Sequence, residues 1–205
     1  MSEWDKLRLE VINCTKCDLY KERRQPVLGE GPLTAEIMLI GEAPGAQEDL
    51  EGRPFVGAAG KLLNKMLGEA GLRRNDIYIT NIVKCRPPGN REPLPHEEEA
   101  CLPYLIRQIA LVKPRLIITM GKHSTRSLLY ISGVKINSIS SVRGKPHNIR
   151  IGSDELMVIP TYHPAAAIYN PSLRQAIVND LKQASNLIKG RTRSIMDFIE
   201  DKEHR

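Results

Sequence analysis

The sequence predicts an α/β fold, a three-layer α/β/α sandwich with a central four-stranded parallel sheet. Four short, apolar, β-branched-rich runs end in glycine, proline or polar loop residues, and they cover residues 36–41, 76–83, 115–121 and 155–160. Stretches with apolar residues at helical spacing separate these runs and cover residues 58–71, 96–113 and 123–131. Alternating strands and helices are typical of parallel βαβ units, in which helices cover both faces of the sheet.

The length and the composition support one globular domain. The chain has 205 residues, of which 41% are hydrophobic, enough for a sizeable core. We expect one domain over residues 1–190, followed by a charged C-terminal tail over residues 191–205. The net charge of +6 suits a polyanionic partner, although a solvated basic face would give the same balance.

Nothing in the sequence indicates export or a membrane anchor. Residues 1–14 are charged and periodic, unlike a secretory signal. No apolar run approaches the roughly 20 residues that a membrane-spanning helix needs. We therefore expect an intracellular, cytoplasmic protein in a reducing environment, where cysteines stay free or bind metal.

The four cysteines of the chain form a close pair, Cys14 and Cys17, and a wider pair, Cys85 and Cys101. Two residues separate the first pair, a spacing typical of metal-binding loops, so all four thiols together can form one sulfur site. Unrelated free thiols, two disulfides, or a redox dithiol at the first pair are the alternatives. If the four cysteines bind one metal centre, that centre connects the two ends of the chain segment that lies between the cysteine pairs.

The loops that follow the four predicted strands carry most of the polar and reactive side chains. These loops cover residues 41–57, 81–93, 121–124 and 160–166. In parallel α/β sheets, ligands bind beyond the carboxyl ends of the strands, so we expect these loops to meet at one crevice. Gly41 and Gly45 bring the backbone close to a ligand there, or they only make a tight turn.

Three side chains of these loops are best suited to hold a planar polar ligand. Phe55 either stacks on the ligand or anchors its loop in the core. Asn81 either caps a turn or offers a carbonyl acceptor beside an NH₂ donor, a pattern that matches N3–H and O4 of uracil and rejects cytosine. His163 either bonds to its own loop or stabilises a developing anion.

An ordered set of motifs resembles one known family. These motifs are Cys14-x-x-Cys17, Gly41-Glu-Ala-Pro-Gly45, Arg53-Pro-Phe55-Val-Gly57, Asn81 with Lys84-Cys85-Arg86-Pro-Pro, Cys101, and His163-Pro-Ala. Together they are similar to those of the family 4 uracil-DNA glycosylases, the iron–sulfur enzymes of thermophilic archaea and bacteria, from about Cys14 to Asp180. The resemblance implies an α/β/α sandwich on a four-stranded parallel sheet, in agreement with the strands predicted above.

The resemblance also implies a cofactor and a reaction. Cys14, Cys17, Cys85 and Cys101 would hold a [4Fe–4S] cluster. Uracil would be flipped out of single- or double-stranded DNA and cut from its sugar by hydrolysis of the N-glycosidic bond, leaving an abasic site for base excision repair. We expect a monomer. The alternative is an iron–sulfur or zinc protein that binds nucleic acid without cutting it.

The family pattern assigns residues of the base pocket. Phe55 would stack on the flipped uracil, Asn81 would read N3–H and O4, and His163 would bond to O2 as charge builds on the leaving base. The backbone around Glu42 and Ala43 would line the pocket.

The chain departs from the pattern of the related family 1 enzymes at Ala43, where those enzymes have an aspartate that orients the water. We expect Glu42, Glu48 or Asn90 to position the water instead. Alternatively, the base departs almost completely before the water attacks, so that no strong base is needed.

The loop after His163 departs from the family pattern as well, because it lacks the leucine pair expected there. Ala167 and Ile168 would form a smaller wedge in the gap left by the flipped base, or Tyr169 would stack there instead. Basic side chains that either contact phosphates or are plain surface charge are Arg86, Lys122, Arg143, Lys145 and Arg174.

Overall fold

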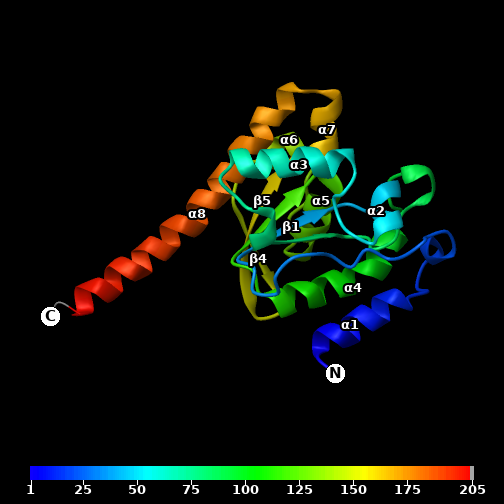
Figure 1. Ribbon diagram of the computed structural model, residues 1–205, viewed down its shortest axis with the longest axis horizontal. Coiled ribbons are helices and arrows are strands. Elements are labelled where there is room, and N and C mark those ends of the chain that lie inside the picture. The colour runs from blue at the N-terminus through cyan, green and yellow to red at the C-terminus, as the bar shows by residue number, and fades with distance from the viewer. Residues whose placement is uncertain (204–205) are drawn as a thin grey trace.

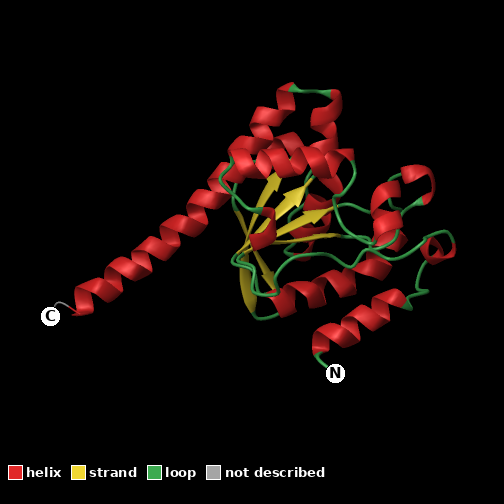
Figure 2. Ribbon diagram, viewed as in Figure 1, coloured by secondary structure: helices red, strands yellow, loops and turns green. Residues whose placement is uncertain are grey.

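The computed structural model describes the backbone of residues 1–203 and the side chains of residues 1–190. Five strands form one sheet in the order β2-β1-β3-β5-β4 (Figures 1 and 2). They are β1 (Ile37–Gly41), β2 (Ile77–Asn81), β3 (Leu116–Met120), β4 (His147–Ile151) and β5 (Asp154–Thr161). β1, β2, β3 and β5 run parallel, and β4 pairs antiparallel with β5.

The four predicted strands are confirmed as β1, β2, β3 and β5, but the predicted strand number is wrong, because the sheet has five strands. Every residue of β1, β2 and β3 is buried. Strands that are covered on both faces have continuous apolar sequences, so they could be predicted from the sequence.

The strand that the sequence did not reveal, β4, lies at the sheet edge. Its residues alternate between exposed Asn148 and Arg150 and the buried Ile149, so it contains no continuous apolar run. The turn to β5 contains Gly152 at φ +62°, in the left-handed region that glycine adopts easily in a hairpin. A short, charged edge strand of this kind resembles a loop in the sequence.

Helices cover both faces of the sheet, so the predicted three-layer arrangement is confirmed (Figure 1). α3 (Ala58–Glu69), α7 (Pro164–Tyr169) and α8 (Ser172–Glu203) pack on one face, while α4 (Pro95–Val112) and α5 (Lys122–Ile131) pack on the other. α1 (Glu3–Ile12) lies against α4 through Leu7 and Tyr104.

The three helices expected between the strands are confirmed as α3, α4 and α5. Further short elements are α2 (Ala46–Glu51), α6 (Ile139–Val142) and the 3₁₀ turns η1 (Asp18–Lys21), η2 (Arg74–Asp76) and η3 (Pro88–Asn90). The backbone of α8 continues past position 190 without a break, so the predicted tail begins as part of this helix. No helix in the described part of the chain is both long and apolar enough to cross a membrane.

Candidate active site

A cleft of about 550 Å³ lies beyond the carboxyl ends of the parallel strands, and we call it the strand-end cleft. All seven side chains expected to form the base pocket or to position water line it: Glu42, Ala43, Glu48, Phe55, Asn81, Asn90 and His163. They come from the last residue of β2 and from the loops after β1, β2 and β5. A larger hollow, of about 1140 Å³, lies at the opposite end of the sheet, where β1 and β2 begin, and none of these seven side chains reaches it.

Gly41, at the end of β1, makes the close approach between two of these side chains possible. A Cβ atom at this position would collide with Oδ1 of Asn81 and with the ring of Phe55. Because β1 and β2 are adjacent and Gly41 is paired with Asn81, the missing side chain leaves room for the amide and the ring side by side.

Asn81 carries a buried polar atom with no partner. Its side-chain oxygen has no hydrogen-bond donor among the described residues, although its residue is only 1% exposed. A buried acceptor without a donor costs about 1–3 kcal/mol, so native proteins rarely keep one without a use. Because Asn81 lines the strand-end cleft, a ligand N–H that enters there is the partner this oxygen lacks.

Phe55 is both a core residue and a wall of the cleft, so the two alternatives for this side chain are not exclusive. It is 5% exposed and packs with residues of β1, β2 and α3. Its ring centroid lies 5.7 Å from that of His163, at an interplanar angle of 35°. Its backbone has φ +52°, which is unusual for a bulky residue.

His163 begins α7, and its ring nitrogens have distinct roles. Nδ1 accepts a hydrogen bond from the backbone N–H of Ala165 at 3.2 Å. Burial lowers the pKa of His163 to about 4, so the ring is neutral at neutral pH. A neutral ring that accepts at Nδ1 carries its proton on Nε2, and this N–H is the donor available to a ligand.

The three candidates for water positioning differ in how their polar groups are used. Oε1 of Glu48 accepts hydrogen bonds from the backbone N–H groups of Val56 and Gly57, both at 2.9 Å. Oδ1 of Asn90 accepts a hydrogen bond from Arg86 at 2.7 Å. The carboxyl group of Glu42, in contrast, has no hydrogen bond to any described residue, and burial raises its pKa.

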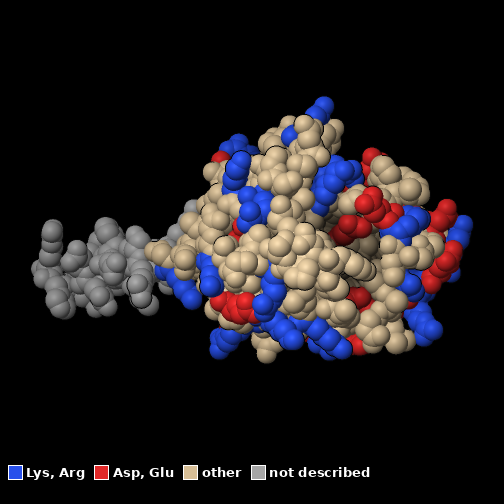
Figure 3. Space-filling view, turned by 90° about the horizontal axis from the view of Figure 1, so that it is seen from above, with Lys and Arg blue, Asp and Glu red and all other residues tan. Residues whose placement is uncertain are grey.

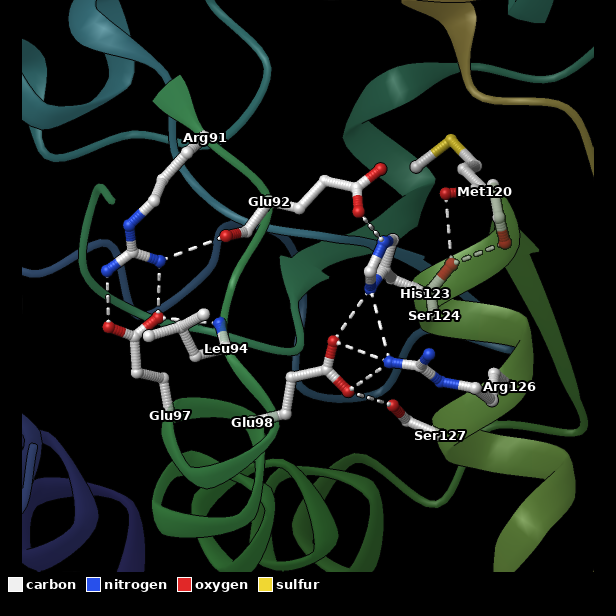
Figure 4. Close-up of polar contacts among 11 residues, drawn as sticks. Arg91, Glu92, Leu94, Glu97, Glu98, Met120, His123, Ser124, Arg126 and Ser127 are labelled. Carbon is white, nitrogen blue, oxygen red and sulfur yellow. Dashed lines mark hydrogen bonds and ion pairs between the residues drawn. The ribbon is translucent and has the colours of Figure 1, made fainter. Parts of the chain in front are cut away.

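Two buried glutamates at the start of α4 connect the loops around the cleft (Figure 4). Glu97 forms an ion pair with Arg91 at 2.7 Å and accepts the backbone N–H of Leu94. The carboxylate of Glu98 is bonded to three side chains of α5, which are His123, Arg126 and Ser127.

The sequence did not single out His123, although the structure places it beside the cleft. Its Nδ1 lies 2.8 Å from Glu98 and its Nε2 lies 3.2 Å from Glu92. The hydrogen bond to Glu98 raises the pKa of His123, and a protonated His123 ring lowers the pKa of the nearby Glu42. Glu98 and His123 are 25 positions apart, and no local pattern connects them.

The four cysteines line one small hollow between α1, α4 and the loop after β2, and we call it the cysteine site. All four thiols are free, so the two-disulfide alternative is not what the structure shows. In the described part of the chain, no three His, Cys, Asp or Glu side chains lie as the ligands of a single metal ion. Burial raises the pKa of Cys101 to about 12, so binding of a metal there must release its proton.

Nitrogen donors lie against two of the four sulfur atoms of the cysteine site. Arg23 Nη1 lies 3.0 Å from Sγ of Cys85, and the backbone N–H of Lys84 donates to Sγ of Cys101 at 3.3 Å. The Lys84 side chain is fully buried, and its Nζ donates to the backbone oxygen of Asn81 at 2.5 Å. One lysine therefore links the cysteine site to the residue that borders the strand-end cleft.

The five basic residues considered for phosphate contact differ in their surroundings. Lys122 is exposed, and Lys145 is exposed with its Nζ bonded to the backbone of Ser141. Arg143 binds Asp180 at 2.7 Å, and Arg174 pairs with Glu69. Figure 3 shows Lys and Arg side chains around the body with acidic side chains among them, so one sign of charge does not cover this face.

The segment considered for the wedge splits between the core and the surface. Ala167 is 5% exposed and packs in the core, whereas Ile168 is exposed and Tyr169 is 89% exposed. Tyr169 also lines the strand-end cleft. The structure therefore leaves Ile168 and Tyr169 as the side chains of this segment that reach solvent beside the cleft.

An aromatic ring, an unpaired amide oxygen and a neutral imidazole meet at the strand ends of a three-layer α/β/α fold. These features define an α/β protein that can hold a planar polar ring. Residues 28–182 match the family model of the Uracil DNA glycosylase superfamily. The chain belongs to this superfamily.

Three similar curated proteins are each named type-4 uracil-DNA glycosylase. The protein from Sulfurisphaera tokodaii is 49% identical over 97% of this chain and 91% of its own length. The one from Saccharolobus solfataricus is 48% identical over 97% and 93%. The one from Archaeoglobus fulgidus is 42% identical over 97% and 100%.

Proposed function

We propose that the protein is a uracil-DNA glycosylase that hydrolyses the N-glycosidic bond of uracil in DNA, single- or double-stranded, and leaves an abasic site for repair. The observation that carries this proposal is the buried, unpaired oxygen of Asn81 at the strand-end cleft. The relatives named above support the same activity.

The amide of Asn81 reads the base. Its oxygen accepts N3–H of uracil, and its NH₂ group donates to O4. Cytosine presents an acceptor at N3 and an amino group at C4, so the same fixed amide would face two mismatched groups. The ring of Phe55, on the wall of the cleft, stacks on the flipped base.

His163 stabilises the leaving base. As the glycosidic bond breaks, negative charge builds on the uracil ring, and Nε2–H of the neutral His163 donates to O2. A preorganised donor of this kind acts on the transition state more than on the substrate, because the charge develops only there. The backbone N–H of Ala165 fixes the ring tautomer that this role needs.

Glu42 is the side chain best placed to position the attacking water. Its carboxyl group is free of hydrogen bonds from the described residues, whereas Glu48 and Asn90 are engaged with the loops that shape the cleft. An ionised Glu42 also stabilises positive charge on the sugar as the base leaves. Burial raises the pKa of Glu42, and His123, which faces Glu98 and Glu92, acts in the opposite direction.

Contacts to DNA complete the site. Tyr169 or Ile168 fills the gap left by the flipped base, and Tyr169 is the larger of these exposed side chains. Lys122 and Lys145 are the exposed cations best suited to phosphates, and Arg86 contributes from the loop after β2. The protein acts as a monomer inside the cell, with its catalytic domain over residues 1–190.

Cys14, Cys17, Cys85 and Cys101 hold a [4Fe–4S] cluster. The donor set fits, because it consists of four free thiols around one hollow, with N–H donors to two of the sulfur atoms. The choice of an iron–sulfur cluster over zinc rests on the resemblance to the family 4 enzymes. Since hydrolysis transfers no electron, the cysteines would hold the cluster as a structural cross-link between the loop after α1, α4 and the loop after β2.

One experiment tests the proposed reaction. The protein is incubated with single- and double-stranded oligonucleotides that contain uracil, thymine or hypoxanthine, and abasic sites are then cleaved with alkali. We expect strand breaks at uracil. Binding without strand breaks would instead support a non-catalytic nucleic-acid-binding protein.

A further inference from the structure

Phe55 adopts a backbone conformation that does not persist without support. Its φ of +52° lies in the left-handed region, which bulky residues with a Cβ avoid. Such residues are found where the surrounding structure holds them, often at a functional site. The structure therefore has to contain groups that fix the peptide units on either side of Phe55.

One of these groups is the guanidinium of Arg74, on η2 directly before β2. Its Nη2 donates to the backbone oxygen of Pro54 at 2.6 Å, and its Nη1 donates to that of Phe55 at 3.2 Å. The same Nη1 donates to the side-chain oxygen of Asn64 on α3 at 3.0 Å. The planar fork of arginine can hold two successive carbonyl groups at once, whereas a lysine ammonium offers a single point.

Arg74 is itself held in place. Its side chain is 18% exposed, and the carboxylate of Glu30 lies 3.8 Å from its Nη2. Glu30 also receives two hydrogen bonds from Arg53, whose side chain is 57% exposed. Both arginines therefore contact one carboxylate, but Arg53 belongs to the Phe55 loop itself, whereas Arg74 holds that loop from η2.

The other side of the Phe55 loop is fixed as well. Glu48 accepts the N–H groups of the next two residues, Val56 and Gly57. Gly60 packs so closely that a Cβ there would collide with the backbone oxygen of Phe55. Carbonyl groups before the turn and N–H groups after it are thus held from opposite directions.

We propose that Arg74 is a positioning residue for the reaction. It acts through Phe55, because it sets the height and tilt of the Phe55 ring against the bound uracil. Arg74 does not line the strand-end cleft, so it acts on the base only through the Phe55 loop. The proposal rests on the proposed function, in which Phe55 stacks on the flipped base. Misplacement of such a group by about 1 Å can lower a rate about 100-fold.

The test compares Arg74→Met and Arg74→Lys with the matched control Arg73→Met, which removes the neighbouring arginine, 82% exposed and bonded to Asp76. Uracil excision is measured under single-turnover conditions, and inhibition by free uracil reports base binding. We expect Arg74→Met to lower the rate about 10- to 100-fold and to weaken uracil inhibition, with Arg74→Lys giving little rescue. Arg73→Met should stay within about twofold of wild type.

A double-mutant cycle with Phe55→Leu separates positioning from general stability. If Arg74 acts through the ring, Arg74→Met should add almost no further loss of rate in the Phe55→Leu background. Thermal unfolding of every variant shows whether it is folded, and if Arg74→Met does not fold, Arg74→Lys takes its place in the cycle.

Two results would overturn the inference. One is a wild-type rate in the Arg74 variants. The other is a loss of rate from Arg74→Met that is as large in the Phe55→Leu background as in the wild-type background. A wild-type protein that cuts no uracil would instead overturn the proposed function itself.

Discussion

The strand-end cleft and the cysteine site lie at the two ends of one short segment, residues 81–85. They differ in whether their polar groups have hydrogen-bond partners. In the cleft, the oxygen of Asn81 has no donor among the described residues, and the carboxyl group of Glu42 has no hydrogen bond to any of them. At the cysteine site, N–H groups already point at the sulfur atoms of Cys85 and Cys101.

The difference is consistent with the role proposed for each region. Unsatisfied polar groups cost stability in the free protein and are matched only when a ligand arrives, as expected where a base is bound. At the cysteine site, N–H donors already hold two of the four sulfur atoms in place, which suits a structural role. Changes in the cleft should therefore lower the rate and leave the fold intact, whereas changes at the cysteine site should lower stability.

The largest effect is expected for His163→Ala. This change removes the donor to O2 of the leaving base, and loss of one preorganised donor lowers kcat about 100- to 1000-fold. Single-turnover excision of uracil measures the rate. Bound iron and the midpoint of thermal unfolding should stay close to wild type, and an unchanged rate would contradict the role of His163.

The next largest effect is expected at the cysteine site, for Cys101→Ser. Serine is a poor ligand for iron, so we expect most of the bound iron to be lost. A loss of about 3 kcal/mol of stability would lower Tm by about 6–12 °C in a chain of this size. Iron content and thermal unfolding measure both, and Asn81→Asp serves as the control that keeps the cysteines. Full iron content in Cys101→Ser would contradict the assigned ligand.

Asn81→Asp should change base preference. The carboxylate keeps an acceptor for N3–H but loses the NH₂ donor to O4, and an unsatisfied partner costs about 1–3 kcal/mol, or about 5- to 150-fold in rate. Excision from oligonucleotides with uracil or cytosine measures the preference. An unaltered ratio would mean that the base is read elsewhere.

A smaller effect should follow from the titration of His163. Its pKa is about 4 in the folded protein, against 6.5 for a histidine in water, so the unfolded chain takes up the proton first on acidification. The neutral ring therefore contributes fully to the free energy of unfolding above about pH 6.5, and this contribution is lost as the pH falls toward 4. With solvent screening taken into account, the loss is about 1–2 kcal/mol.

Ring ¹⁵N shifts of His163 should accordingly show a neutral ring, protonated at Nε2, between about pH 5 and 8. The matched comparison is His163→Gln, in which the loss of stability between pH 6.5 and 4 should be smaller. A ring that titrates near 6.5 would contradict the burial argument.

The smallest effect is expected for Tyr169→Ala. This side chain is 89% exposed, so its loss should not affect folding. If it fills the gap in the duplex, excision from double-stranded DNA should fall about two- to fivefold, with little change on single strands, where no stack has to be rebuilt. An equal loss on both substrates would assign Tyr169 to base binding instead.

The buried strands and the residues that follow them could be predicted from the sequence. β1, β2 and β3 are covered on both faces, so their sequences are apolar throughout, and the parallel arrangement then places Glu42, Asn81 and His163 at one end of the sheet. β4 was missed because an edge strand with one buried face carries charges that resemble a loop.

The sequence by itself determined which residues meet at the strand-end cleft, because chain order and strand direction fix where each loop emerges. Tertiary structure alone decided the state of these residues. The unpaired oxygen of Asn81, the tautomer of His163 and the left-handed backbone of Phe55 depend on burial and on partners distant in the chain. Arg74 is 19 positions from Phe55, and no local pattern encodes a contact between a guanidinium and two carbonyl groups across that distance.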